Sequence, residues 1–245
     1  MDINQIASNG LKTCKKNISF SGLKKVFAFT LAEILITLGI IGVIAAMTLP
    51  TLTKNIYEKQ TITKLKATYS IVARALRLCE SENGDATTWG LKGRWSSDEA
   101  QIIANNLKPY FKIALDCGLN DSQKKCISKN YKQKNGAIHN INFATDTRYY
   151  KIVLANGTSI WWKSSDSGEY NSGRIISLYV DTNGVSPPNV WGKDLFLFGY
   201  DNGTFVPAGA PNSVHPYERN CLPKNSNGWG CTWYVLQHNS MDYLQ

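Results

Sequence analysis

The chain has 245 residues, of which 43% are hydrophobic, and it carries 27 Lys and Arg against 18 Asp and Glu. This composition is typical of a folded protein of one or two domains and excludes a disordered chain. Residues 29–49 contain a single charge, whereas the chain from Pro50 onward is polar, aromatic and rich in Gly and Asn. That distribution excludes a polytopic membrane protein and argues against a wholly cytoplasmic one.

The excess positive charge is concentrated at the N-terminus. Residues 1–28 hold five lysines and one aspartate, a net charge of +4 out of the +9 of the whole chain. After Pro50 there is no run rich in Lys or Arg with interleaved aromatic residues. The charge therefore predicts a positive flank on a membrane segment, and we expect no specific nucleic-acid partner.

Residues 29–49 are long and apolar enough to form a helix that crosses the hydrocarbon core of a membrane. Lys24 and Lys25 precede this segment, so the positive-inside rule keeps residues 1–28 in the cytoplasm and exports the chain after Pro50. Three interpretations compete: a secretory signal peptide cleaved at the small residues of positions 43–46, a permanent anchor, and a segment cut on its cytoplasmic side. Glu33 separates them, because a carboxylate in such a segment is costly unless it has a partner.

The sequence KKVFA, followed by FTLAEILITLGIIGVIAAMTLPTL, resembles the N-terminal processing and methylation signal of type IV pilins and type II secretion pseudopilins. The resemblance implies that a prepilin peptidase cuts between Ala28 and Phe29 and methylates the new terminal amine. It also implies that Glu33 pairs with the amine of a neighbouring subunit, and that Pro50 kinks or locally melts the helix. Residue 28 is Ala where the family usually has Gly, and a leader of 28 residues is long for the family.

An amphipathic helix is predicted directly after Pro50. Apolar residues recur there every three or four positions with basic residues between them, until Asn83-Gly84 ends the pattern. We expect one helix from residue 29 to about residue 80, apolar all round in its first half and amphipathic in its second. The apolar stripe of the second half consists of Leu52, Ile56, Ile62, Leu65, Tyr69, Val72, Leu76 and Cys79.

A second helix and an antiparallel sheet are predicted to follow. A capping box formed by Ser96 and Glu99 opens a helix through residues 101–111. Its buried side is expected to comprise Ile102, Ile103, Leu107, Tyr110 and Phe111. Asn156-Gly157 and Asn202-Gly203 predict two hairpin turns. Strands are expected over residues 137–144, 148–155, 158–163, 174–181, 195–200 and 204–207.

The predicted fold is α+β, with a long kinked N-terminal helix packed on a small antiparallel β-sheet and disulfide-stapled loops. The resemblance makes this architecture pilin-like. We expect four parts: a basic leader that is removed (residues 1–28), a transmembrane or filament-core half of the helix (29–50), an amphipathic half (51–84) and an exported globular domain (85–245).

The cysteines suggest two disulfides. Cys14 would leave with the leader, and export places the other five Cys in an oxidising compartment. Two pairs are close in sequence within loops rich in Asn, Lys and Gly, which favours the disulfides Cys117–Cys126 and Cys221–Cys231. Cys79 is expected to be a buried free thiol on the helix stripe, although its pairing with Cys117 or Cys126 stays open.

A zinc site is not expected, because no CxxC motif occurs and no histidine has a ligand spacing with the cysteines. The stretch YVDTNGVSPPNVWGKDLF offers Asp181, Asn183 and Asp194 as oxygen ligands for calcium. It resembles a D-x-N-G calcium turn and the calcium-binding loop of some pseudopilins, but the full EF-hand pattern is absent. Ordinary turn chemistry of Asp, Asn and Gly is the alternative.

No enzyme motif is found: a nucleophile elbow, a phosphate loop and a zincin motif are all missing. The seven tryptophans include Trp161, Trp162, Trp191, Trp229 and Trp233. They suggest either a carbohydrate- or protein-binding face or a core, and aromatic residues in strands and in a disulfide-stapled tail favour the core.

The resemblance implies a structural subunit of a type IV pilus or a type II secretion pseudopilus, which works by assembly. A mature chain of 217 residues favours a minor or specialised subunit. The implied partners are prepilin peptidase, other pilin or pseudopilin subunits, the inner-membrane assembly machinery and, before assembly, membrane lipid. The implied location is the inner membrane with an exported C-terminal domain, and then a periplasmic or cell-surface filament. The alternative is a Sec-secreted or membrane-anchored extracellular binding protein with a Trp-rich domain.

Overall fold

The computed structural model describes residues 30–171, 173–201, 203–211 and 213–244. The chain divides into two compact units, residues 1–50 and residues 51–245, which are described separately. Helix α1 (Leu31–Asn83) contributes to both, with Pro50 inside it. The predicted end of this helix is confirmed: Gly84 has φ +77° and its N–H donates to the carbonyl of Glu80.

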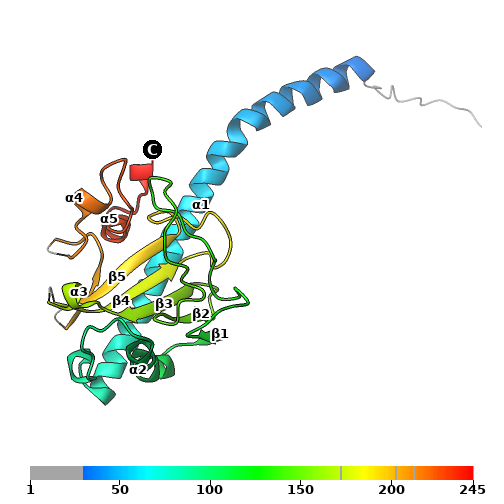
Figure 1. The fold of residues 1–245 in the computed structure, drawn as a ribbon. Helices are drawn as coiled ribbons and strands as arrows, with labels where there is room; N and C mark the ends of the chain where they lie inside the picture. Colours follow the sequence, from blue (N-terminus) through cyan, green and yellow to red (C-terminus); the bar gives the residue numbers. More distant parts are fainter. Residues whose placement is uncertain (1–29, 172, 202, 212, 245) are drawn as a thin grey trace, which may run out of the picture. The chain divides into compact units, whose positions relative to one another are not determined.

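The second unit contains the α+β fold that was predicted (Figure 1). The elements after α1 are short helices and the strands of one sheet. The helices are α2 (Ser97–Leu107), α3 (Ser167–Asn171), α4 (Tyr217–Asn220) and α5 (Cys231–His238). The 3₁₀ helices are η1 (Ala86–Thr88), η2 (Lys108–Tyr110) and η3 (Asp242–Leu244). The strands are β1 (Ile113–Gly118), β2 (Tyr150–Leu154), β3 (Ser159–Ser164), β4 (Arg174–Asp181), β5 (Leu195–Asp201) and β6 (Thr204–Pro207).

The six strands form one antiparallel sheet in chain order, from β1 at one edge to β6 at the other. The turn at Asn156-Gly157 joins β2 to β3 as predicted, and Gly157 has the positive φ, +80°, that this hairpin needs. Strands β5 and β6 also form the expected hairpin, although Asn202 lies outside the described residues.

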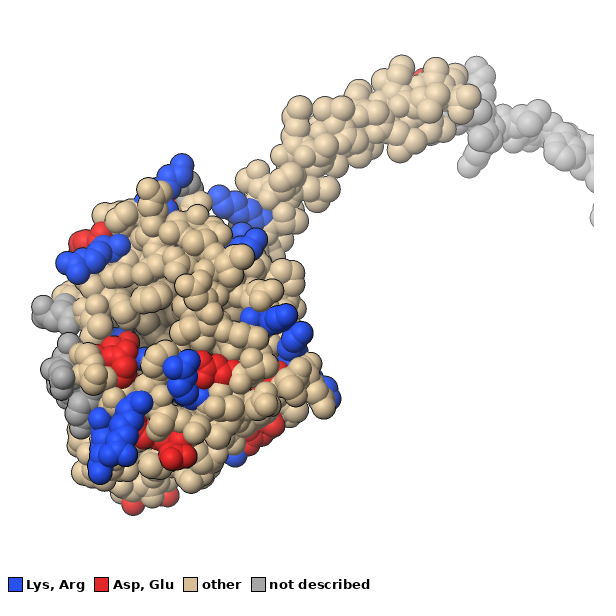
Figure 2. All heavy atoms as spheres, viewed as in Figure 1, with Lys and Arg blue, Asp and Glu red and all other residues tan. Residues whose placement is uncertain are grey.

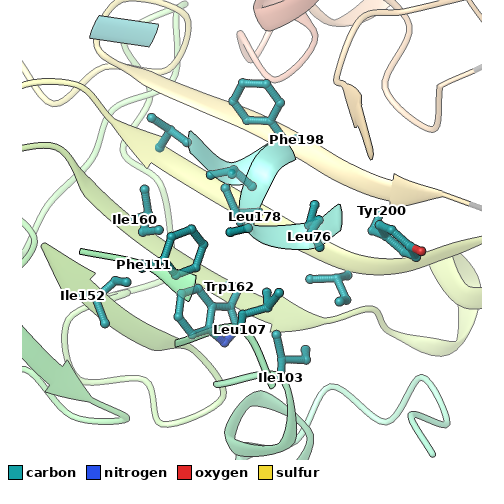
Figure 3. Packing of buried hydrophobic residues seen from close by; sticks show 14 of the residues in the cluster. Leu76, Ile103, Leu107, Phe111, Ile152, Ile160, Trp162, Leu178, Phe198 and Tyr200 are labelled. Carbon is teal, nitrogen blue, oxygen red and sulfur yellow. The ribbon is translucent and has the colours of Figure 1, made fainter. Parts of the chain in front are cut away.

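One face of the sheet packs on the helices, and we call it the helix-covered face. Alternate strand residues such as Ile160, Trp162 and Leu178 meet Leu65 and Leu76 of α1 there, together with α2 (Figure 3). Tyr69 of α1 stacks on Phe198, with 5.8 Å between the ring centroids. This cluster fixes the amphipathic half of α1 to the sheet.

The opposite face is covered mostly by loops, and we call it the loop-covered face. Its strand residues include Trp161, Tyr179 and Leu197, which alternate with those of the helix-covered face. Tyr131, Phe143 and other residues of the long connection between β1 and β2 pack on them. The sheet is therefore buried on both sides, by different kinds of structure.

Several local predictions are wrong. Residues 137–144 do not form a strand; Ile138 makes one isolated bridge, and Phe143 and Ala144 pack on the loop-covered face instead. The edge position belongs to β1, which the sequence did not reveal. In the capping box, Ser96 does accept from the N–H of Glu99, but the Glu99 carboxylate turns away to accept from the N–H groups of Lys92 and Arg94.

Helix α2 also ends earlier than predicted, at Leu107, because Pro109 cannot continue it. Its buried side includes Ile103 and Leu107 as expected, and two alanines complete it. Ile102 and Tyr110 are only partly buried.

Candidate functional site

The apolar half of α1 is the most distinctive candidate for a functional segment. Its large apolar side chains between residues 31 and 49 are 45–76% exposed. By length and composition, this helix could cross a membrane, and a signal sequence would meet the same criteria. On the face seen in Figure 2, its side chains are almost all uncharged, whereas acidic and basic side chains are intermixed on the globular unit. Such an exposed apolar surface is typical of segments that contact lipid or protein.

Glu33 lies in the first turn of this helix and has a local partner. Its Oε2 atom accepts from the N–H of Thr30 at 2.8 Å and from the Thr30 hydroxyl at 2.9 Å. The Thr30 hydroxyl in turn accepts from the N–H of Glu33 at 3.2 Å. This is a reciprocal capping box, which the T-x-x-E spacing could have predicted. It satisfies one carboxylate oxygen, and Oε1 makes no hydrogen bond to a described residue.

The predicted processing residues cannot be placed, since Ala28 and Phe29 lie outside the described residues. Pro50 lies within α1, and the boundary between the two compact units follows it directly.

The structure contains both disulfides that were expected, Cys117–Cys126 and Cys221–Cys231. The first joins the end of β1 to the loop that covers the sheet, and the second joins the residue after α4 to the start of α5. Cys79 is a free thiol in the helix-covered core, where its Sγ donates to the carbonyl of Asn106 at 3.3 Å. Burial raises the pKa of this thiol.

Within the described ranges, one group of three potential metal ligands comes together: Cys117, Asp121 and Cys126. Both sulfurs belong to the disulfide, so they are not free to bind a metal. The Asp121 carboxylate accepts from the N–H groups of Lys125, Cys126 and Ile127. This group is better explained as a hydrogen-bonded loop than as a metal centre.

Asp181 and Asp194, two of the predicted calcium ligands, are both fully buried, and the charge of Asp194 acts on the carboxyl group of Asp181. Burial is the main cause that raises the pKa of Asp181 well above its ordinary range, and the charge of Asp194 adds to it. Burial likewise raises the pKa of Asp194 to about 6.

Protein donors reach all four oxygens of these carboxylates. Asp181 accepts from the Tyr131 hydroxyl and from the N–H of Asn183, and Asp194 accepts from the N–H groups of Asn189 and Val190. Turn chemistry therefore accounts for both carboxylates. The buried Oδ1 atoms of Asn183 and Asn189 have no hydrogen-bond donor among the described residues. This is the state expected of oxygen atoms that bind a cation. The calcium site stays a prediction.

The tryptophans divide between the core and the surface. Trp161, Trp162 and Trp191 are at most 1% exposed, so they are core residues, as favoured from the sequence. Trp229 and Trp233 are only partly buried.

Lys151, which the sequence did not single out, is fully buried on the loop-covered face, where its ammonium donates to the carbonyls of Leu119 and Asp146, each at 2.6 Å.

Comparison with curated proteins and with solved structures finds no match. One family model does match, over residues 51–241, which is most of the chain and almost all of the second compact unit. The match begins one residue after Pro50, so the apolar half of α1 lies outside it. With its α+β unit covered nearly from end to end, the chain belongs to the family of unknown function DUF6613.

Proposed function

We propose that this chain is a prepilin-like structural subunit of a type IV pilus or a type II secretion pseudopilus. The observation that carries the proposal is the apolar half of α1, whose large side chains are 45–76% exposed. A helix with an apolar surface all round is suited to lipid before assembly and to packing against copies of itself afterwards. The resemblance of residues 24–52 to prepilin signals supports the same role.

The N-terminal end of the helix supports a specific role for Glu33. Cleavage between Ala28 and Phe29 would place a new amine four residues before this carboxylate. In the proposal, the terminal amine of a neighbouring subunit donates to Oε1 of Glu33, while Oε2 keeps its bonds to Thr30. A charge-assisted hydrogen bond in an apolar setting is stronger than one in water.

The exported unit would be carried by the same helix. Leu65, Val72 and Leu76 of α1 are at most 4% exposed within the helix-covered core. Because these contacts join α1 to the sheet, a force or a position imposed on the helix is transmitted to the unit. The size of the mature chain favours a minor or specialised subunit, with prepilin peptidase and the inner-membrane assembly machinery as partners.

The second candidate is a secreted or anchored extracellular binding protein, since a signal peptide would share the length and apolarity of α1. Mass spectrometry of the N-terminal peptide, on protein isolated from its native host, separates the two. A methylated Phe29 would support the prepilin role. A chain that begins near Ala46 would contradict it and favour the second candidate.

The role of Glu33 is tested by Glu33→Gln, with Thr30→Ala as the matched control. Gln also fits the capping-box position, so Glu33→Gln keeps the helix cap and removes the charge that pairs with the amine. We expect Glu33→Gln to insert into the membrane normally and to lose incorporation into filaments. Thr30→Ala, which removes the hydroxyl cap and keeps the carboxylate, should still be incorporated. If Glu33→Gln is incorporated like the wild type, the proposed role of Glu33 is wrong.

A further inference from the structure

A small pocket with an aromatic lining opens on the loop-covered face of the sheet. Its volume is about 180 Å³, below the roughly 300 Å³ at which pockets for drug-sized ligands begin. It would hold about six water molecules at about 30 Å³ each, so its occupant is small. Five aromatic side chains line it: Trp95, Tyr149, Tyr179, Trp191 and Trp229. They come from five separate places along the chain, which the fold brings together.

Several lining residues carry polar ring atoms that lack a partner. The Nε1–H groups of Trp95, Trp191 and Trp229 are buried without an acceptor among the described residues. Both ring nitrogens of His139, another lining residue, are in the same state. A buried polar group without a partner costs free energy, and most are paired in folded proteins. Four such residues line one pocket, which favours a ligand with hydrogen-bonding groups over a purely apolar one.

The charges of the lining argue against an anionic ligand. Burial lowers the pKa of His139, and it lowers the pKa of His215 to about 4, so both rings are neutral at pH 7. Lys163 is the single cation of the lining, and its ammonium already pairs with Glu169 at 2.6 Å. A second carboxylate, that of Asp166, has 48% of its side chain exposed. Carboxylates thus outnumber the cation by two to one.

A quaternary ammonium ligand, which aromatic pockets also bind, fits less well. The Trp95 ring is already covered by the Arg148 guanidinium, 3.7 Å from its centroid, and by the Lys163 ammonium at 5.0 Å. A methylated ammonium also offers no acceptor to the indole and imidazole N–H groups. A hydroxyl group offers both a donor and acceptors.

We propose that this pocket binds a single sugar ring of a neutral carbohydrate. The apolar face of the ring would stack on Trp229, a tryptophan at the partly exposed rim. Its hydroxyls would accept from indole and imidazole N–H groups and donate to Asp166 and Glu169. The site lies on the sheet face away from α1, and the proposal does not depend on how the N-terminal segment is processed.

The test is binding of free sugars to the full-length chain in detergent micelles. The probes are glucose, galactose, mannose and N-acetylglucosamine, followed by saturation-transfer NMR and tryptophan fluorescence. We expect saturable binding of at least one sugar with a dissociation constant on the order of 1 mM, as suits a small ligand. Tetramethylammonium and inorganic phosphate serve as comparison probes. If none of the sugars binds saturably, or if only a comparison probe does, the proposal is wrong.

Variants locate the binding. Trp229→Ala should weaken the sugar by at least about tenfold, because it removes a stacking ring and an N–H donor. Trp233→Ala is the matched control, because Trp233 is also partly buried and lies four residues away but does not line the pocket. This variant should bind the sugar like the wild type. Asp166→Asn, a change at a partly exposed side chain, provides a second variant that should weaken binding by about fivefold to tenfold even if Trp229→Ala fails to fold. Equal binding by Trp229→Ala or Asp166→Asn and the wild type, or equal loss in Trp233→Ala, would overturn the site.

A last comparison distinguishes a free sugar from the end of a longer chain. A methyl glycoside of the bound sugar and an oligosaccharide that ends in it are compared with the free monosaccharide. Binding of all three with similar affinity supports a terminal ring as the physiological ligand. Binding of the free monosaccharide alone supports a small soluble sugar.

Discussion

The two faces of the β-sheet are both buried, yet they are built from different chemistry. The helix-covered face is lined mainly by aliphatic and aromatic side chains such as Ile160, Trp162 and Leu178. The loop-covered face holds Trp161 and Tyr179 together with buried charged residues, among them Lys151 and Asp181. The difference follows from what covers each face.

A helix satisfies its own backbone hydrogen bonds, so it covers a sheet with apolar side chains and needs little else. Loops bring backbone groups without such partners. On the loop-covered face, the ammonium of Lys151 supplies donors to two loop carbonyls, and the carboxylate of Asp121 accepts three loop N–H groups. Buried charges are thus the partners that irregular backbone requires. The same irregularity leaves room for a pocket lined by unpaired ring N–H groups.

Trp162 and Trp161 offer the strongest test of this comparison, because they are neighbours on opposite faces and both are 0% exposed. Substitution of either by Ala should cost about 3–5 kcal/mol in the free energy of unfolding. Trp162→Ala should cost about 1 kcal/mol more, since its Nε1–H donates to the carbonyl of Ala100 and that of Trp161 has no described partner. Denaturant unfolding of both variants measures the difference. An equal or larger loss in Trp161→Ala would contradict the comparison.

Lys151→Met should have the next largest effect. The substitution keeps an apolar stem of similar length and removes the donor from two half-buried loop carbonyls, so we expect a loss of about 2–4 kcal/mol in the free energy of unfolding. Lys129→Met, at an exposed lysine on the same connection, is the matched control and should change it by less than about 0.5 kcal/mol. Similar values for the two variants would show that the loop carbonyls do not need Lys151.

The smallest effect concerns pH and Asp194. Its pKa is about 6 in the folded protein against an ordinary 3.8, so the folded state holds the proton more tightly and binds more protons between these values. Protonation therefore stabilises the fold: the contribution of Asp194 to the free energy of unfolding should fall by roughly 1 kcal/mol as the pH rises from 5 to 7. Asp194→Asn should lack this dependence. His215, with its lowered pKa, acts in the opposite direction in both proteins, and the difference between them measures Asp194 together with its effect on Asp181.

The same pair of proteins tests the calcium prediction. A bound cation would hold the carboxylates of Asp181 and Asp194 in their charged form and reverse the pH dependence. Calcium would then raise the melting temperature of the wild type at pH 7 but not that of Asp194→Asn. If calcium has no effect on the wild type, the hydrogen-bonded turn is the complete explanation of this loop.

Local signals in the sequence were sufficient for much of the fold. The bounds of β4 and β6 match the predicted residues 174–181 and 204–207, and both hairpins form where the Asn-Gly pairs stand. Strand β1 was missed because its residues are mostly exposed or half-buried at a sheet edge and carry no clear alternation. Residues 137–144 have the composition of a strand, but tertiary packing uses them as a cover for the aromatic face.

Whether a candidate site can be predicted from the sequence depends on how far apart its residues lie along the chain. The capping box of Glu33 with Thr30 spans three residues and was readable, although it was missed. The disulfides join residues 9 and 10 positions apart, and their pairing was predicted. The pocket joins Trp95, His139, Lys163 and Trp229, whose separation along the chain no periodic pattern encodes. Such sites emerge only once the strands and loops are placed.

The last helical turns of the second unit lie against its beginning. The N–H of Met241 donates to Glu58 of α1 at 2.5 Å, and Lys66 of α1 donates to Asn239. The consequence is one of connectivity, because a short linker from residue 244 to residue 51 would close the unit into a ring. New ends could then be opened at residues 122–125, which are all exposed, and a circular permutant made in this way should keep the sheet and both of its covers.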